Sequence, residues 1–429
     1  MVNLSTPRSM GAQWRARLLS LHTMALPLLL IMALASCAAP ATMRQSSGGQ
    51  TRVTPTPTQP ISDTNPAPSL TLAQAWGNVA ITRVPSLLPN GELFIGGDNA
   101  TPDGQWLIGE VEPRGMLDNK SVYPQLALYN IHTLQVRVIQ TLRNPQSRLD
   151  GISTDGRWLV WDDAATPADW VMYVCDLQTG VIRTLATALS VNGQYAPSHS
   201  GPLVSNGYAV WSQSTELNPQ GNLNGLPSVH VQEENLSSGA VTTVGHSAYV
   251  DSFSWPWVAS DQYTSTGSSS VVLQNLLTQQ RKPLNVESGA NTLGLDGATV
   301  ALEVDSGDTV ALIPDVARST TPQTVYALNA ANVSQLGYLT LDDRLVAWGG
   351  NGSDPMPTVW DRTQRVTVTL PTKNIPQALG AYADGPLLIW MDPTLPAVHE
   401  QSGEQNGLSP LYTYCIVDTT QLSAKASAA

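Results

Sequence analysis

A unit of about 46 residues returns along this chain from residue 100 to the C-terminus. Each copy contains a polar turn, a short apolar strand that often ends in Trp, a loop, a second apolar strand, a turn and a third strand. The clearest copy runs from Ser153 to Leu185. Repetition at this period is typical of a propeller, because one small sheet cannot bury both of its own faces.

Seven copies of the unit follow one another. Their first turns are Asp103-Gly104, Asp155-Gly156, Asn206-Gly207, Ser254-Trp255-Pro256, Asp296-Gly297, Asp342-Asp343 and Asp384-Gly385. Gly104 and Gly385 are separated by 281 residues and six steps, about 47 residues per step, which suits a four-stranded blade. The apolar runs after these turns are too short for helices and rich in β-forming residues. The sequence therefore predicts an all-β fold, a β-propeller of seven four-stranded blades.

At these turns the chain resembles the TolB-like family of β-propellers, a WD40-like repeat family. Thr101-Pro102-Asp103-Gly104 and Asp176-Leu177-Gln178-Thr179-Gly180 match its repeat best. The resemblance covers residues 95–422. It implies the fold and, by analogy of fold, contact with another protein. The Gly-His and Trp-Asp signature of true WD40 repeats is missing, and the matched motif carries no catalytic residue.

The N-terminus has the pattern of a bacterial lipoprotein signal. Arg8, Arg15 and Arg17 precede an apolar run that is too short to span a membrane comfortably. The run ends at residues 34–37, Leu-Ala-Ser-Cys, which resembles a lipobox and implies cleavage before Cys37 and lipid attachment there. An ordinary signal peptide with an incidental Cys is the alternative, and translation could also begin at Met10.

Three segments follow from these patterns. Residues 1–36 are predicted to be the signal peptide, and residues 37–72, rich in Thr, Pro and Ser, a disordered tether. Residues 73–424 are predicted to form the propeller. The stretch from Trp76 to Ile95 precedes the first full copy, and we expect it to supply the strand that completes the last blade, because open sheet edges are a liability.

Composition excludes some partners. The net charge is −12 with 13% charged residues, which argues against nucleic acid and against direct binding to an anionic bilayer. We expect the membrane to be reached through the N-terminal lipid alone, and the mature protein to lie outside the cytoplasm, in the periplasm or on the cell surface. Cys175 and Cys415 lie on strands of the second and seventh copies, so we expect two buried thiols rather than a disulfide.

Loop lengths indicate where a partner would bind. Within a blade the first and third turns are tight, whereas the connections between the second and third strands are long in six of seven copies, as at Val111 to Gln125, Asp162 to Asp169, Gln213 to Pro227 and Asp392 to Pro410. Long loops on one side of a rigid scaffold usually carry binding. Neutral variation of surface loops is the alternative.

The sequence contains few patterns that suggest a catalytic or metal-binding site. The segment Gly245 to Tyr249 approaches a nucleophile elbow but has Tyr where the last Gly is required. The six His are scattered without metal-ligand spacing, and Asp162-Asp163 and Asp305/Asp308 are more typical of solvated turns than of calcium ligands. We predict no catalytic residue, no metal and no cofactor.

Recurring aromatic residues are interpreted as core. Trp161, Trp211, Trp348 and Trp390 end the second strand of their copies and should pack between blades. The weak candidates for binding a sugar or a peptide are Trp255, Trp257, Tyr123, Trp170 and Trp360.

These observations favour a non-enzymatic module that binds an unknown protein or cell-wall component on its loop side. The alternative is a hydrolase or lyase that acts on a polysaccharide or peptide in the central funnel. A sensor of a small solute is a lesser alternative. A binding module predicts an apolar or aromatic patch on the loop side, whereas an enzyme predicts convergent carboxylates with raised pKa.

Overall fold

The computed structural model describes most of the chain from Ser69 to Leu422. The described residues are 69–113, 122–166, 168–191, 194–195, 199–215, 229–263, 269–284, 293–304, 309–327, 336–350, 357–372, 380–393 and 411–422, and they belong to one compact unit. Cys37, Asp305 and Asp308 lie outside them, as do the predicted signal peptide and most of the predicted tether. In the described part of the chain, no helix is long and apolar enough to cross a membrane.

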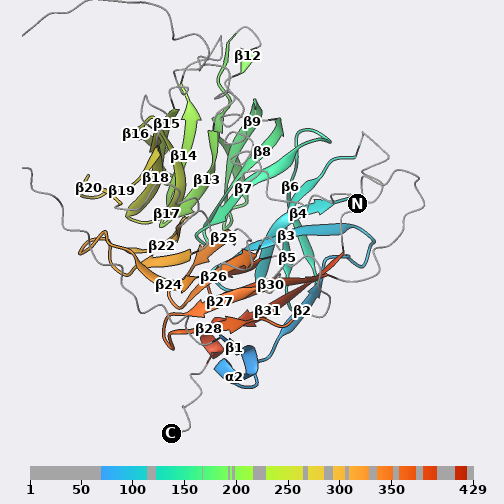
Figure 1. Ribbon diagram of the computed structural model, residues 1–429. Coiled ribbons are helices and arrows are strands. Elements are labelled where there is room, and N and C mark those ends of the chain that lie inside the picture. Colours follow the sequence, from blue (N-terminus) through green and yellow to red (C-terminus); the bar gives the residue numbers. More distant parts are fainter. Residues whose placement is uncertain are drawn as a thin grey trace, which may run out of the picture. The chain divides into compact units, whose positions relative to one another are not determined.

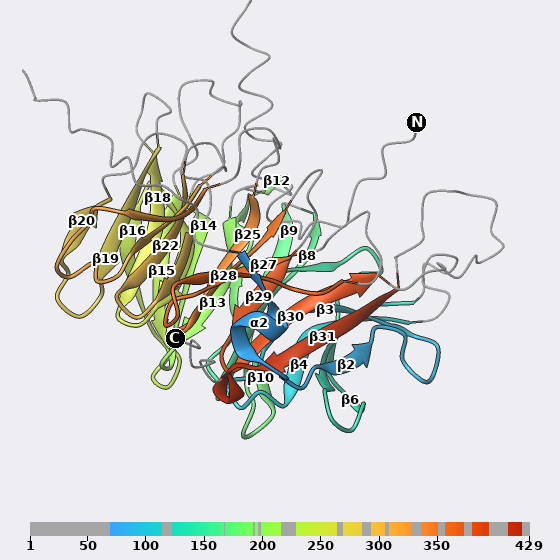
Figure 2. The ribbon, with the colours of Figure 1, turned by 60° about the horizontal axis from the view of Figure 1, so that its bottom comes forward.

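Seven antiparallel sheets form the seven blades of a propeller (Figures 1 and 2), which confirms the predicted fold. Within each blade the strands are called A to D in the order in which they lie side by side. The first three blades contain β3 (Leu93–Ala100), β4 (Trp106–Glu112), β5 (Gln125–Asn130) and β6 (Val136–Thr141); β7 (Arg148–Thr154), β8 (Trp158–Thr166), β9 (Asp169–Asp176) and β10 (Val181–Thr187); and β13 (His199–Ser205), β14 (Tyr208–Ser214), β15 (Val229–Asn235) and β16 (Ala240–His246).

The other four blades follow the same order. They contain β17 (Ala248–Ser254), β18 (Trp257–Tyr263), β19 (Ser269–Asn275) and β20 (Arg281–Pro283); β21 (Leu293–Asp296), β22 (Thr299–Val304), β23 (Thr309–Ile313) and β24 (Gln323–Ala327); β25 (Leu336–Leu341), β26 (Leu345–Gly350), β27 (Thr358–Asp361) and β28 (Val366–Thr369); and β29 (Ala381–Asp384), β30 (Leu387–Pro393), β31 (Tyr412–Asp418) and β2 (Thr82–Pro85). Outside the blades lie a small hairpin, β11 (Ser190–Val191) with β12 (Gln194–Tyr195), the helix α2 (Leu72–Trp76) and a 3-10 turn, η3 (Thr419–Gln421).

The A strands form the inner ring, since each contacts the A strand of the next blade from β3 around to β29 and back to β3. Side-chain oxygens at the ends of A strands hold neighbouring blades together. The Oγ of Ser153 accepts the backbone N–H of Val204 at 3.1 Å, and the Oγ of Ser254 accepts that of Gly297 at 2.7 Å. Asp384 of the seventh blade accepts the N–H of Ala100 of the first, so the same kind of contact closes the ring.

The hydrophobic core is divided among the blade interfaces. Seven clusters of buried side chains each join two neighbouring blades. Trp161, Trp211, Trp348 and Trp390 are buried, and each packs against the preceding blade, which confirms their predicted place between blades. Each sheet thus buries its faces against its neighbours, as a repeat architecture requires.

Local turn chemistry explains the repeating sequence. The Gly of each Asp-Gly or Asn-Gly pair has positive φ, for example 67° at Gly104 and 79° at Gly207, which only Gly adopts at little cost. Strand C ends in Asp or Asn in six blades, and its side-chain oxygen accepts backbone N–H groups of the following turn. Asp176, for example, accepts those of Gln178 at 2.9 Å and Thr179 at 3.3 Å.

The last blade combines both ends of the chain. β2 pairs antiparallel with β31, with Arg83 opposite Cys415, so the N-terminal segment supplies strand D of a blade whose other strands come from residues 381–418. This confirms that the stretch from Trp76 to Ile95 completes the last blade. Cys175 and Cys415 are free thiols buried at different blade interfaces, as expected.

The structure contains a second N-terminal contact that the sequence does not predict. β1 (Ser69–Thr71) lies parallel to β28 and adds a fifth strand to the sixth blade, and α2 follows it directly (Figure 1). A capping box at Thr71 begins α2, since the Oγ1 of Thr71 accepts the backbone N–H of Gln74 and the Oε1 of Gln74 accepts the backbone N–H of Thr71. Residues 69–72, which comprise β1 and the first residue of α2, fall within the range 37–72 that the sequence predicts as tether.

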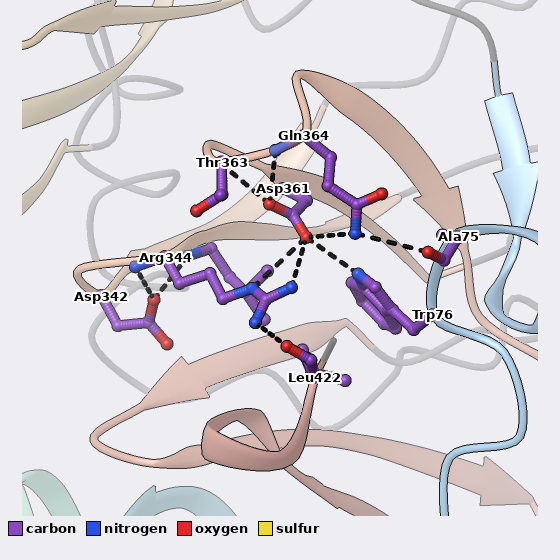
Figure 3. A network of polar contacts seen from close by, with 9 residues as sticks. Ala75, Trp76, Asp342, Arg344, Asp361, Thr363, Gln364 and Leu422 are labelled. Carbon is purple, nitrogen blue, oxygen red and sulfur yellow. Dashed lines mark hydrogen bonds and ion pairs between the residues drawn. The ribbon is translucent and has the colours of Figure 1, made fainter. Parts of the chain in front are cut away.

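A buried polar network fixes this segment (Figure 3). The Oδ2 of Asp361 accepts the indole N–H of Trp76 at 2.8 Å and a guanidinium N–H of Arg344 at 3.0 Å. Arg344 also donates to the carbonyl oxygen of Leu422 at 2.5 Å. Burial alone would raise the pKa of Asp361, but hydrogen bonds from Gln364, Trp76 and Arg344 outweigh it and lower the pKa. Asp361 and Arg344 of the sixth blade therefore join the N-terminal helix and the C-terminal end of the propeller.

Candidate functional site

The two ends of the blades differ. We call the end with the A–B and C–D turns the turn end, and the end with the B–C and D–A connections the loop end. All A strands run in the same direction, so every B–C connection leaves from the loop end. The strand bounds leave residues 113–124, 215–228, 351–357 and 394–411 as long B–C connections.

The prediction of a long loop from Asp162 to Asp169 is wrong. β8 continues to Thr166, which is directly opposite Asp169 of β9, so only residues 167 and 168 link the two strands. Asp162 and Asp163 are fully buried rather than solvated. The strand tolerates these carboxylates because each takes a partner from a neighbouring blade.

Asp162 and His199 join the second and third blades. The Nε2 atom of His199 lies 2.6 Å from the Oδ2 of Asp162, and the imidazole stacks on the indole of Trp170 with the ring centroids 4.5 Å apart. Burial raises the pKa of Asp162, and the hydrogen bond with His199 opposes that shift. His199 is itself 5% exposed in its side chain, so this pair lies inside the interface.

A second charged group joins the first and second blades. Asp163 accepts the backbone N–H of Arg143 at 2.8 Å, and the guanidinium of Arg143 reaches Asp169 at 3.2 Å. Glu110 lies between the blades, with its Oε1 3.7 Å from Arg148. Burial raises the pKa of Glu110 to about 7, because the attraction of Arg148 does not compensate for lost hydration.

These carboxylates converge from β4 and β8, and two of them have raised pKa, which is the pattern expected of acid–base chemistry. The oxygens of Glu110, Asp162 and Asp163 are nevertheless buried between blades, and the partly exposed members of the group are Arg143, Arg148 and Asp169. The described arrangement can hold blades together. It gives a substrate no direct access to Asp162, Asp163 or Glu110.

Three histidines lie in one row across the third blade. His199 is directly opposite Gln213, Gln213 is opposite His230, and His230 is opposite His246. Directly opposed residues of antiparallel strands point to the same face of a sheet. The row therefore lies at the loop end, on the face that packs against the second blade. The sequence spacing of these His gives no hint of it, because the row exists only through strand register.

The predicted binding residues do not form one site. Tyr123 is 38% exposed and lies within the long 113–124 connection of the first blade, whereas Trp170 and Trp257 are buried. Trp255 lies at the turn end and stacks on Tyr208, with ring centroids 3.9 Å apart. Trp360 packs, partly buried, against the core between the fifth and sixth blades. Whether any of them contacts a ligand stays a prediction.

The described residues form no enclosed metal site. Among the described residues, no three His, Cys, Asp or Glu side chains lie close enough together to hold a metal ion.

No protein-family model matches this chain, and no curated protein matches its sequence. Among solved structures, it is similar to the β-propeller domain of the Trilobed protease from Pyrococcus furiosus, with a TM-score of 0.52, 9% identity, and coverage of 79% of this chain and 98% of that one. It is also similar to an oligogalacturonate lyase from Vibrio parahaemolyticus, with a TM-score of 0.50, 10% identity, and coverage of 83% and 100%. At these identities the likeness supports the fold alone.

Proposed function

We propose that this chain is a lipid-anchored, extracytoplasmic propeller of the TolB-like type that binds a protein or a cell-wall component through its loop end. The observation that carries the proposal is the difference between the two blade ends. The turn end is made of short turns closed by their own side chains, whereas the long connections 113–124, 215–228, 351–357 and 394–411 all leave from the loop end.

Charge and burial support binding rather than catalysis. The buried carboxylates Glu110, Asp162 and Asp163 already have partners across the blade interfaces, so they stabilise the packing of neighbouring blades. The negative net charge disfavours nucleic acid as the partner. In this proposal the lipid on Cys37 supplies the membrane affinity, and the propeller supplies the specificity.

Shortening two loops tests the proposal. Ser214 is directly opposite Val229, and Pro393 is directly opposite Tyr412, so an Asn-Gly pair can replace residues 215–228 or 394–411 as a two-residue hairpin turn. We expect both variants to keep the unfolding midpoint of the wild type, because paired strands on each side remain intact. Both should lose at least about tenfold in affinity for the partner that co-purifies with the wild type, or about 1.4 kcal/mol.

Matched controls lie at the turn end. Gln178→Arg and Ser237→Arg place a bulky charge in the C–D turns of the second and third blades, where both positions are exposed. These two variants should capture the partner as well as the wild type does. Equal loss of partner from both ends of the blades, or from neither end, would contradict binding at the loop end.

A further inference from the structure

We propose that residues 69–76 are a detachable strap that occupies a peptide-recognition site on the outer edge of the sixth blade. The strap consists of β1 and α2, and β28 is the edge strand that it covers. The site takes a peptide in which a short strand is followed by a turn of helix and a Trp. It contains none of the long B–C connections of the loop end.

The strand of the strap is an addition to the blade. The sixth blade is antiparallel, as between β27 and β28, whereas β1 lies parallel to β28 and is joined to it by only three residue pairs. Parallel pairs are slightly less stable per residue than antiparallel ones. Strand addition to a sheet edge is a general mode of peptide recognition, in which backbone hydrogen bonds supply affinity and side-chain pockets supply specificity.

The blade recognises the side chains of the strap. Leu72, Ala75 and Trp76 are buried and belong to the hydrophobic cluster shared by the sixth and seventh blades. The indole N–H of Trp76 donates to the Oδ2 of Asp361 at 2.8 Å, and the amide of Gln364 donates to the carbonyl oxygen of Ala75 at 3.3 Å (Figure 3). The site therefore selects a Trp through both its apolar ring and its one donor group.

The strap can leave without opening the ring. β2, which closes the seventh blade, has its own ladder of four residue pairs with β31 and is separated from α2 by residues 77–81. Gly77 has a φ of 75°, and a Cβ at this position would meet nothing within 4 Å, so this turn has open space beside it and can serve as a hinge. A helix of five residues is not stable alone in water, so α2 forms only while it is docked.

Hydrogen exchange of the full wild-type chain tests whether the strap detaches. The backbone N–H groups of Thr71, Gln74 and Gly77 are all hydrogen-bonded to groups of the strap. They should exchange at least about tenfold faster than the N–H of Ser86, which follows β2 and donates to the carbonyl oxygen of Tyr412 at 2.8 Å, because the strap opens locally. Equal rates would mean that the strap opens only when the propeller unfolds, and would overturn the proposal.

Peptide capture tests the recognition site. Trp76→Ala in the full chain weakens the hold of the strap on the blade, so a fluorescent peptide of residues 69–77 should bind this variant at least about tenfold more tightly than it binds the wild type. Fluorescence anisotropy measures both affinities. The same peptide with Trp76→Ala should bind neither protein, because it lacks the indole that Asp361 accepts.

Trp161→Ala provides a matched control, since it removes an equally large buried side chain from another blade interface and leaves the strap in place. It should not bind the peptide. The proposal is overturned if Trp76→Ala captures no peptide at about 1 mM, or if Trp161→Ala captures it as well. The hydrogen-exchange test uses the wild type alone, so it decides the matter if Trp76→Ala does not fold.

Discussion

Two fully buried tryptophans provide a matched test of how the blade interfaces are stabilised. Trp161 and Trp390 occupy the same position of strand B in the second and seventh blades, and both are 0% exposed. The indole N–H of Trp390 donates to the carbonyl oxygen of Pro371 at 2.9 Å. That of Trp161 has no hydrogen-bond partner among the described residues.

Replacement by Ala should destabilise both proteins to a similar degree. Each substitution removes a complete buried indole and leaves a cavity between blades, which costs about 3–5 kcal/mol. Replacement by Phe should destabilise the protein by different amounts at the two positions. Trp390→Phe loses a hydrogen bond worth about 0.5–1.5 kcal/mol, whereas Trp161→Phe removes a buried donor whose lack of a partner costs about 1–3 kcal/mol.

The loss of ring area is the same in the two Phe variants and cancels in their comparison. Trp390→Phe should therefore be more destabilising than Trp161→Phe by at least about 1.5 kcal/mol. Urea unfolding at neutral pH, followed by far-ultraviolet circular dichroism, measures both free energies of unfolding. We expect the two variants to share the same dependence of this free energy on urea concentration. Equal effects of the two Phe variants would refute the role assigned to the hydrogen bond, and unchanged midpoints in both Ala variants would refute the burial.

Two further predictions concern pH and the anchor. The pKa of Glu110 is raised from 4.5 to about 7 in the native state, so the native protein holds a proton that the unfolded chain has released, and the free energy of unfolding should fall as the pH rises from about 4.5 to about 7. In Glu110→Gln, urea unfolding across that range should show a decrease in the free energy of unfolding that is smaller by up to about 3 kcal/mol. An unchanged pH dependence would contradict the raised pKa of Glu110. Cys37→Ala should release the protein from the membrane fraction or leave it unprocessed, because the lipid supplies the membrane affinity; unchanged partition into detergent would contradict a lipoprotein.

Much of the fold could be predicted from local sequence. The Asp-Gly and Asn-Gly pairs predict turns in which the Gly has positive φ, and their spacing predicts the number of blades. The position of Trp161 or Trp390 within its copy predicts its burial, because one apolar strand after each turn must face a neighbouring blade. Each of these signals depends on residues close together in the chain.

The candidate site could not be predicted in the same way. Asp162 and Asp163 suggest a solvated loop until His199 and Arg143 are seen to supply their partners from neighbouring blades. The pairing of His230 with His246 depends on the register of β15 and β16, to which the spacing of His residues in the chain gives no guide.

The sequence by itself determined the repeat, the blade count, the closure of the last blade by an N-terminal strand and the tryptophans of the core, since turn chemistry and strand period are local properties. The tertiary structure alone decided which polar side chains meet across blades, and that β1 and α2 are held on the sixth blade through Trp76 and Asp361, residues 285 positions apart in the chain. Such contacts are selected by the three-dimensional arrangement of the blades, because burial makes a carboxylate depend on whichever donor the neighbouring blade places beside it.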